Sequence, residues 1–459
     1  MGAKKPALHF VRRQVARILR QVLAGNTQHR ALASIKSLVY KPSIVAKKAT
    51  LALICNTLKY LPVIKDIVHS VGLLQGRKNK GQDELFYVLT HDLLFEQEIL
   101  PSGKEEIFVL SRKAALRAAF VRLMMKKNVT EIDGLLPTES RQLQSCDIPR
   151  YVRVNTLQIT VDEALEKLEE LGAKVDELLP DLLVLPPGTD LHDHSLVLQG
   201  SIFLQSKASC IPAHVLSPDP DWEVLDACAS PGNKTVHLAA LMKGKGRVTA
   251  CELHKKRLQV LQDTVKRAGA NNIQVKHQDF LKLDPNASDY RKVRAILLDP
   301  SCSGSGTTVQ RMDHLLPVAN DDPEFQHDAQ RIDRLASFQK AALCHALSFP
   351  AVERVVYSTC SVNQRENEDV VQSVLEHARS HKFKLGTVLP NWPHRGLPVF
   401  DGAQHLLRTD ALRDKTDGFF VALFVRERSQ TFEQQRKRKS SEIEERKTKR
   451  KKKKQKKLN

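Results

Sequence analysis

The N-terminal part of the chain carries hydrophobic residues at helical spacing. Between residues 11 and 22, apolar positions recur every three or four residues, while Arg13, Arg17 and Arg20 occupy another face of the same helix. Further helical patterns, separated by glycine, proline or polar breaks, cover residues 30–40, 43–60, 83–94 and 113–126. These patterns predict a helical domain with a basic face over residues 1–136.

The pattern changes near residue 148, where strand-like alternation begins. Residues 150–155 alternate like a half-buried strand, residues 161–171 return to helical spacing, and residues 182–185 are again strand-like. Small α/β modules with such a β-α-β unit often handle nucleic acid. We therefore expect a small α/β RNA-binding module over residues 148–200.

From residue 201 onwards, strands and helices alternate as in a doubly wound α/β sheet. The expected strands are residues 223–228, 247–252, 273–277, 295–299, 354–359 and 418–425, with helices such as 255–268 and 331–348 between them. The last strand is almost continuously apolar, as a strand buried on both faces should be. A Rossmann-like sheet is the fold that we predict for residues 201–428.

The charge of the chain is concentrated at its two ends. Thirteen Lys and Arg residues occur up to Lys65 and no acid precedes Asp66, while fourteen Lys and Arg face three Glu between Arg436 and Lys457. The formal net charge of +20 favours a polyanionic partner. Residues 429–459 have hardly any apolar side chains, so we expect a disordered basic tail, typical of a nuclear or nucleolar address or an RNA-binding segment.

Simpler explanations of the charged ends stay open. The Arg-rich start is also typical of a mitochondrial presequence or of a solvated face without a ligand, and the tail is also typical of a solubilising segment. No apolar run reaches 18 residues, so we expect no membrane span. The eight cysteines form no C-x-x-C pair and have no histidine at zinc spacing, which predicts reduced thiols and no structural metal.

The loop after the first expected strand of the sheet has the features of a cofactor site. It consists of Cys228, Ala229, Ser230, Pro231, Gly232, Asn233 and Lys234. Its glycine spacing fits neither a Walker A motif nor G-x-G-x-x-G, but small residues let the backbone approach a ligand beside a helix N-terminus. Glu252 ends the second strand, where an acid is placed to hold two ribose hydroxyls, and Asp279 follows the third strand. An acid for the ribose without a diphosphate loop favours S-adenosylmethionine, although each acid is alternatively an ordinary capping carboxylate.

Two of the expected strands end in a thiol. Residues 296–299 lead through Pro300 and Ser301 to Cys302, and residues 354–359 lead to Cys360. Ligands bind at the carboxyl ends of strands in open α/β sheets, so both thiols and Asp299 are expected at the ligand-binding edge. Either cysteine alone is more often an inert core residue, whereas the pair beside a cofactor loop favours chemistry.

These motifs resemble the Nol/Nop/Sun family of RNA cytosine-C5 methyltransferases. The matching stretches, which place the resemblance over residues 148–427, are Arg153–Thr156, Asp226–Lys234, Asp299–Gly306, Tyr357–Ser361 and Asp417–Ala422. The chain is most similar to the eukaryotic large-subunit ribosomal RNA branch, the fifth-numbered member. Residues 205–209 depart from the family, which usually has an acid after the glutamine, and we assign that segment no contact.

The resemblance implies S-adenosylmethionine as cofactor and assigns a role to each motif. Residues 228–234 would cradle the methionine part, Glu252 would bind the ribose with a contribution from Arg257, and Asp279 would lie beside the adenine. Asp299 would border both the cofactor and the target base. Cys360 would be the nucleophile and Cys302 would assist product release.

The reaction explains why two thiols and an acid are needed. C5 of cytosine is a poor nucleophile, and a thiolate that adds at C6 turns the ring into an enamine whose C5 can take a methyl group. Asp299 is placed to assist at N3 and the exocyclic amine as a general acid. A second thiol, Cys302, suits the final loss of the C5 proton and release, and Lys234 is a candidate neighbour that lowers the pKa of the attacking thiol.

We therefore expect an S-adenosylmethionine-dependent enzyme that forms 5-methylcytosine in RNA, in large-subunit ribosomal RNA within the nucleolus of the nucleus. Two alternatives stay open. In the first, the substrate of the enzyme is transfer RNA. In the second, the protein is an RNA-binding ribosome-assembly factor with a mainly scaffolding role. The residues predict neither the target nucleotide nor the oligomeric state.

Overall fold

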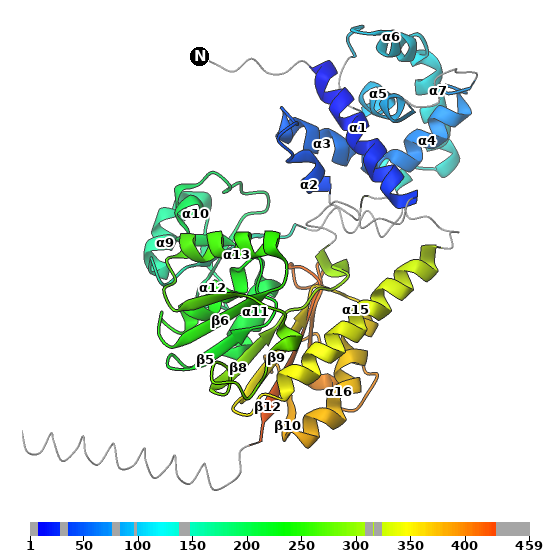
Figure 1. The fold of residues 1–459 in the computed structure, drawn as a ribbon. Coiled ribbons are helices and arrows are strands. Elements are labelled where there is room, and N and C mark those ends of the chain that lie inside the picture. Colours follow the sequence, from blue (N-terminus) through cyan, green and yellow to red (C-terminus); the bar gives the residue numbers. More distant parts are fainter. Residues whose placement is uncertain are drawn as a thin grey trace, which may run out of the picture.

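The computed structural model describes residues 8–27, 35–75, 83–95, 99–136, 147–307, 315 and 324–427. A group of helices formed by the N-terminal part of the chain lies above a large sheet with helices on both of its faces (Figure 1). The predicted disordered tail over residues 429–459 lies outside the described residues.

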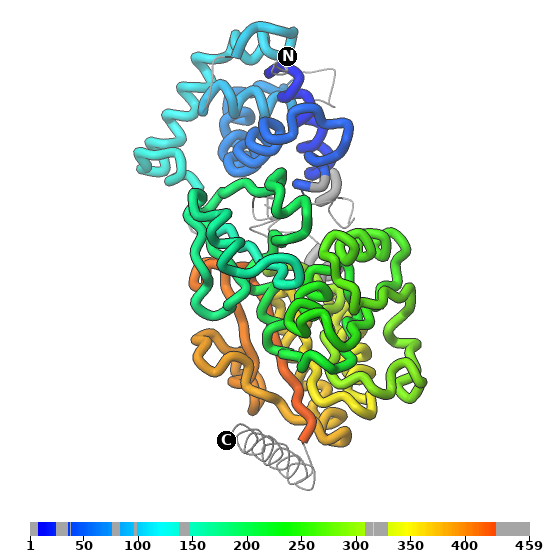
Figure 2. Tube along the Cα trace, turned by 90° about the vertical axis from the view of Figure 1, so that its left-hand side faces the viewer, coloured from blue at the N-terminus to red at the C-terminus, as the bar shows by residue number. Residues whose placement is uncertain are grey.

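The N-terminal helices, which group together at the top of Figure 2, pack around one apolar core. They are α1 (Leu8–Thr27), α2 (Ile35–Val39), α3 (Lys47–Lys59), α4 (Leu61–Ser70), α5 (Asp83–Phe95), α6 (Lys104–Ser111) and α7 (Lys113–Lys127), followed by the 3-10 turn η1 (Ile132–Leu135). The apolar face predicted for α1 is buried through residues such as Val15 and Leu19. The sequence pattern did not predict α4 and α6. In the case of α4, Pro62 suggested a break between helices, but it lies in the first turn of the helix, where proline is tolerated.

The next part of the chain forms a four-stranded antiparallel sheet. Its strands are β1 (Arg150–Val154), β2 (Lys174–Val175), β3 (Leu182–Leu185) and β4 (Ile202–Leu204), in the order β2-β3-β1-β4, with helices α9 (Val161–Lys167) and α10 (Ser195–Gln199) and the 3-10 turn η2 (Glu169–Leu171) between them. This β-α-β-β-α-β connectivity is that of a ferredoxin-like module. We expected the module to end at residue 200, but β4 lies beyond that point and pairs with β1. Strands of two or three residues are too short to give a periodic signal.

The large sheet is Rossmann-like, as predicted. Its strands are β5 (Glu223–Asp226), β6 (Arg247–Glu252), β7 (Ile273–His277), β8 (Val293–Leu298), β9 (Arg354–Thr359), β10 (Phe383–Gly386), β11 (Leu407–Thr409) and β12 (Phe419–Arg426). The order is β10-β12-β9-β8-β5-β6-β7, with β11 paired to β12. Strands β5 to β9 are parallel, and β12 enters antiparallel to β9. The strand order reverses between β5 and β8, and ligands bind at such a switch point in open α/β sheets.

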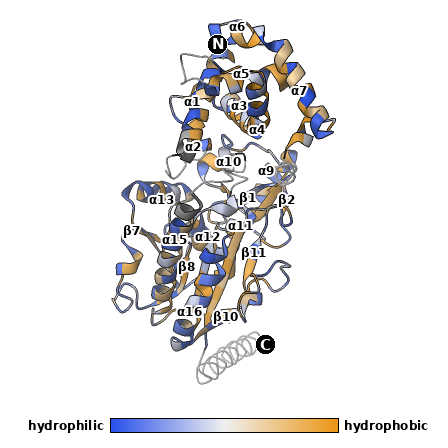
Figure 3. Cartoon of the chain, turned by 90° about the vertical axis from the view of Figure 1, so that its right-hand side faces the viewer, coloured by the Kyte–Doolittle hydropathy of each residue, from blue (hydrophilic) through white to orange (hydrophobic). Residues whose placement is uncertain are grey.

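Helices cover both faces of this sheet. They are α11 (Lys207–Leu216), α12 (Asn233–Leu241) and α13 (Lys255–Ala268) on one face, and α15 (Glu324–Leu347) and α16 (Glu368–Ser380) on the other. Residues of β8 alternate between the two cores, since Ala295 and Leu297 join one and Ile296 and Leu298 join the other. Figure 3 shows the resulting pattern, with hydrophobic strands inside and hydrophilic helix surfaces outside. Both faces are apolar because both are buried.

The helical N-terminal region contacts the other two parts of the chain. Leu315, which lies between the Cys302 loop and α15 in the sequence, packs against the helical core. Lys48 of α3 makes a 2.8 Å ion pair with Asp190 of the ferredoxin-like module. The N-terminal region is therefore in contact with Leu315, a residue that follows one of the two predicted thiols in the sequence.

Candidate active site

The carboxyl ends of β5 and β8 meet at a cavity of about 170 Å³. The residues that line it are Ser209, Asp226, Cys228, Ala229, Ser230, Pro231, Asn233, Lys234 and Asp299. The predicted cofactor loop thus faces the cavity through every member except Gly232. The structure brings this loop and Asp299 together at the switch point of the sheet.

Gly232 lets the loop turn closely against α13. Its φ of +105° lies in the region that side chains rarely adopt, and an added Cβ would come within 3.0 Å of Leu261 and 3.1 Å of Thr264. The next residue, Asn233, begins α12, so the backbone of the loop leads directly into a helix N-terminus beside the cavity. Glycine at this position is therefore required by the backbone.

Lys234 and Asp299 form the charged centre of the cavity. Lys234 Nζ lies 2.9 Å from one oxygen of Asp299, whose other oxygen accepts a 2.7 Å hydrogen bond from the Ser358 hydroxyl. Lys234 also donates to the Ser209 hydroxyl at 3.0 Å. Burial lowers the pKa of Lys234, but the charges of Asp299 and then Cys360 more than offset it, so the net pKa is raised and the amine stays protonated. Cys360 is among the groups whose charge raises the pKa of Lys234, so the two residues interact electrostatically.

The two predicted thiols lie next to each other. Cys302 Sγ and Cys360 Sγ are 3.2 Å apart, a hydrogen-bonding distance for sulfur. The hydrogen bond to Cys360 and burial both raise the pKa of Cys302. The hydrogen bond therefore links the ionisation of the two thiols and favours the protonated form of Cys302.

Asp226 is a buried acid at the cavity that we did not single out as a site residue. It ends β5 and is only 1% exposed, and its carboxylate accepts a 2.7 Å hydrogen bond from the Thr235 hydroxyl. Burial and the nearby Asp299 carboxylate together raise its pKa to about 7, although the Thr235 hydroxyl and Lys234 act in the opposite direction. The strand-end position was visible in the sequence, but its burial was not.

The remaining predicted residues lie along the same edge of the sheet but outside the lining of this cavity. Glu252 is buried at the end of β6, where it accepts a hydrogen bond from the His254 backbone and lies 3.5 Å from Arg257. Arg257 donates to the Ser230 carbonyl at 2.7 Å, so it holds the cofactor loop in place. Asp279 caps the 3-10 turn η3 (Phe280–Lys282), the capping role that the sequence analysis left open.

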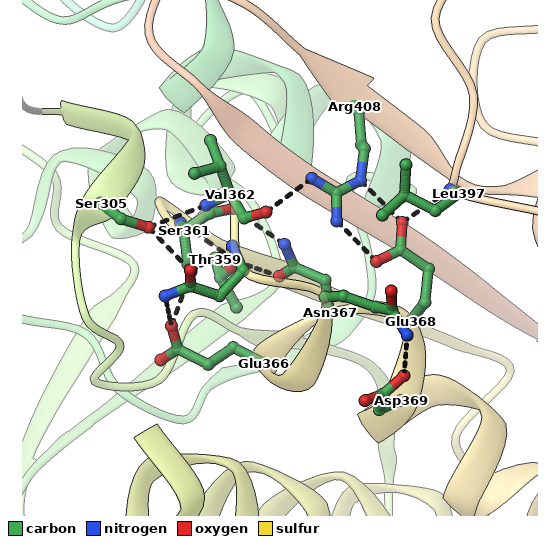
Figure 4. A network of polar contacts seen from close by, with 12 residues as sticks. Ser305, Thr359, Ser361, Val362, Glu366, Asn367, Glu368, Asp369, Leu397 and Arg408 are labelled. Atoms are coloured by element: carbon green, nitrogen blue, oxygen red, sulfur yellow. Dashed lines mark hydrogen bonds and ion pairs between the residues drawn. The ribbon is translucent and has the colours of Figure 1, made fainter. Parts of the chain in front are cut away.

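Glu366, which precedes α16, binds the loops of both thiols, and Figure 4 shows it beside Ser361 of the Cys360 loop. One carboxylate oxygen accepts hydrogen bonds from the Ser303 backbone N–H at 2.8 Å and from the Gln339 side chain at 3.1 Å. The other accepts from the Ser361 hydroxyl at 2.6 Å and from the Asn363 side chain at 3.2 Å. Burial opposes ionisation, but these donors lower the pKa of Glu366 overall, so it is a carboxylate. No sequence motif that we used indicated this role.

Further contacts close the same region. The Asn367 side chain accepts from the Thr359 hydroxyl and donates to the Ser361 carbonyl, and an Arg408–Glu368 ion pair of 2.6 Å lies beside them (Figure 4). The Gly306 backbone donates to the Cys360 carbonyl at 2.9 Å. The backbones on either side of Cys360 are therefore fixed within the protein.

Three general properties hold for the described part of the chain. No group of three or more His, Cys, Asp or Glu residues there is arranged to hold a metal ion. No helix in those ranges has the length and apolar character needed to cross a membrane. None of the cysteines in these ranges forms a disulfide bond.

The fold and the site together define a Rossmann-like methyltransferase. Residues 213–425 match the family described as 16S rRNA methyltransferase RsmB/F. Residues 48–136 match the N-terminal domain of NOL1/NOP2/Sun domain family member 5, and residues 173–205 match the ferredoxin-like domain of the same member. The chain belongs to the NOL1/NOP2/Sun family, in the branch of member 5, which confirms the resemblance drawn from the motifs.

Relatives of high similarity carry consistent names. The chain is 53% identical to the 25S rRNA (cytosine-C(5))-methyltransferase NSUN5 of Arabidopsis thaliana, over 91% of this chain and 73% of the relative. It is 41% identical to the 28S rRNA (cytosine-C(5))-methyltransferase of Mus musculus, over 88% of this chain and 89% of the relative. The similarity therefore extends well beyond the catalytic motifs.

Solved structures agree on the fold. A methyltransferase homologue from Pyrococcus horikoshii covers 80% of this chain and 99% of its own, with a TM-score of 0.51 at 23% identity. NSun6 from Pyrococcus horikoshii, solved with SFG, covers 70% of this chain and 97% of its own, with a TM-score of 0.51 at 20% identity. At this identity the likeness concerns the fold alone.

Proposed function

We propose that the protein is an S-adenosylmethionine-dependent methyltransferase that forms 5-methylcytosine in large-subunit ribosomal RNA. The observation that carries the proposal is the pair of sulfurs 3.2 Å apart beside a charged cavity at the switch point of the sheet. The printed names of the relatives support both the reaction and the RNA substrate.

The cavity and its surroundings fit the proposed cofactor. Residues 228–234 offer backbone groups and a helix N-terminus for the methionine part. Glu252 ends β6 and Asp279 follows β7, on the side where a ribose and an adenine would extend. Arg257 supports the loop through Ser230. When bound, S-adenosylmethionine supplies the methyl group.

Cys360 is the proposed nucleophile. Its thiolate adds to C6 of the target cytosine, and the electron pair of the C5–C6 double bond moves into the ring so that C5 becomes nucleophilic. The protonated Lys234 favours the thiolate before attack, because it lies close to Cys360. Asp299, held by Lys234 and Ser358, is the group that we place at N3 and the exocyclic amine of the base.

The contact between the two sulfurs explains how Cys302 can act after Cys360 has attacked the base. While Cys360 is a thiolate, the hydrogen bond between the sulfurs keeps Cys302 protonated. Once Cys360 is bonded to C6, its sulfur carries no negative charge, so that hydrogen bond no longer raises the pKa of Cys302. Cys302, once its own proton has passed to solvent, is then the proposed base that accepts the C5 proton. The electron pair of the C5–H bond re-forms the C5–C6 double bond, the C6–S bond breaks and Cys360 leaves as a thiolate.

The proposed substrate requires an accessible base. A cytosine inside a duplex cannot reach these sulfurs, so the target base is unpaired or flipped out of its stack. The ferredoxin-like module and the basic N-terminal region are the proposed RNA contacts, and the nucleolus within the nucleus is the proposed location, since large-subunit ribosomal RNA is the proposed substrate.

Site-resolved bisulfite mapping of RNA tests this function. Cells that lack the protein should lose methylation at one or more large-subunit ribosomal cytosines, and wild-type protein should restore it whereas Cys360→Ala should not. Loss of a transfer RNA site alone would contradict the ribosomal substrate. Restoration of the cellular function by Cys360→Ala would favour a scaffolding role instead.

A further inference from the structure

The outward face of α1 carries three arginines around a second cavity. This cavity measures about 180 Å³ and is lined by Arg13, Ala16, Arg17, Arg20 and Leu85. No carboxylate is among the lining residues. The three arginines are those that the sequence placed on one face of this helix, and the catalytic site uses none of them.

The arginines of α1 differ in how their charges are neutralised. Arg12 faces the core, where it is 2% exposed and makes a 2.6 Å ion pair with the buried Asp92. Arg13 and Arg20 lie 3.0 Å from Glu105 and Glu84. Arg17 lies between them and is exposed, and within the described residues it has no carboxylate at ion-pair distance.

This arrangement preorganises an anion site. Glu105 and Glu84 hold the two outer guanidinium groups from the sides, while Arg17 keeps its full charge at the centre. Guanidinium groups match the planar geometry of phosphate oxygens, and donors held in place lose less entropy on binding. Arg12, which faces inward on the same helix, is paired with the buried Asp92. The uncompensated charge of Arg17 is therefore specific to the outward face.

We propose that Arg13, Arg17 and Arg20 bind a backbone phosphate of the RNA substrate, with Arg17 as the principal contact. The proposal rests on the proposed function, which supplies RNA as the partner. Charge complementarity favours this occupant, because Arg17 keeps its charge at the centre of the site and no acidic residue precedes Asp66 in the whole sequence. The site would hold ribosomal RNA on the helical region while the target base enters the catalytic cavity.

The test compares charge reversals at two exposed cations of the full-length protein. Arg17→Glu removes the proposed contact, and Lys65→Glu makes the same change in charge on α4, away from the cavity. Affinity for a large-subunit ribosomal RNA fragment that contains the target cytosine is measured by fluorescence anisotropy at several salt concentrations. Arg17→Glu should weaken binding about ten-fold and lower the salt slope by about one, while Lys65→Glu changes affinity less than about two-fold.

Two further measurements keep the result interpretable. Matched thermal unfolding midpoints show that both variants fold, and the KM of methylation for RNA should rise for Arg17→Glu. Equal affinities and slopes for the two variants would overturn the proposal, as would an Arg17-dependent binding to anionic lipid vesicles with RNA binding unchanged. If the wild-type protein binds RNA through Arg17 but forms no 5-methylcytosine, the proposed function fails while the phosphate site stands.

Discussion

The two halves of the candidate active site satisfy their polar groups in opposite ways. On the thiol side, which comprises the loops around Cys302 and Cys360, Glu366 accepts four hydrogen bonds from within the protein. On the cofactor side, which comprises residues 226–234 and Asp299, the polar groups line a cavity of about 170 Å³. One half is closed by its own chain and the other is open to a ligand.

This difference indicates that the thiol side is the more rigid half of the site. Covalent attack requires the two sulfurs to keep a fixed position, and the donors around Glu366 provide it before the RNA arrives. In the proposed function, the cofactor side binds and releases S-adenosylmethionine in each cycle, so part of its polar surface must face that ligand. Mutations on the thiol side should therefore lower the rate of chemistry, whereas mutations on the cofactor side should alter ligand binding and the response to pH.

Removal of the proposed nucleophile should cause the largest loss of activity. Cys360→Ala should lower methyl transfer by more than about three orders of magnitude, because the uncatalysed attack of C5 has no covalent route. Incorporation of labelled methyl groups into RNA measures the rate. Cys344→Ala, which changes a thiol of α15 outside the site, is the control and should retain activity. Substantial turnover by Cys360→Ala would refute the covalent role.

Glu366→Gln tests whether the hydrogen bonds of Glu366 position the two sulfurs, because it leaves both thiols in place. The amide places an N–H group where a backbone or side-chain donor now points, so the loops must shift. We expect kcat to fall about ten- to hundred-fold with little change in KM for RNA or S-adenosylmethionine. The control is Glu376→Gln on the exposed surface of α16. An unchanged kcat would show that the network does not position the thiols.

Asp226→Asn tests the cofactor side through the pH dependence of stability. Burial raises the pKa of Asp226 from 3.8 to about 7 in the folded protein. Its contribution to stability is therefore fully present below pH 3.8 and is lost as the pH rises through 7, because only the unfolded chain ionises freely in between. The free energy of unfolding of the wild type, relative to Asp226→Asn, should fall by about 1–4 kcal/mol across this window and then level off. Urea unfolding at stepped pH values measures this difference, and a difference that is constant with pH would contradict the raised pKa.

The sequence predicted the parts of the molecule whose signals are local. The strands of the Rossmann-like sheet have strong apolar runs, and the thiols and Asp299 stand at strand ends, where topology alone brings them to one edge. The helical pattern of α1 likewise predicted its buried face and its arginine face. Each of these features depends on residues that are neighbours in the chain.

The sequence could not predict features that depend on residues far apart in the chain. Glu366 is 63 residues away from Ser303, and its role depends on a meeting of two loops that no periodicity encodes. Ser209 lies in the segment that departs from the family pattern, so it gave no signal, yet it holds Lys234. The three-residue strand β4 is too short for a pattern, and only its pairing with β1 places it in the ferredoxin-like module.

The attachment site of a trapped RNA tests the central claim most directly. Cys302→Ala removes the thiol that we assign to release, so the protein should accumulate a covalent complex with RNA that survives denaturation. Mass spectrometry of the digested complex should find a cytidine nucleotide on the peptide that contains Cys360. Attachment at another residue, or normal turnover by Cys302→Ala together with an adduct formed by Cys360→Ala, would contradict the assigned roles of the two sulfurs.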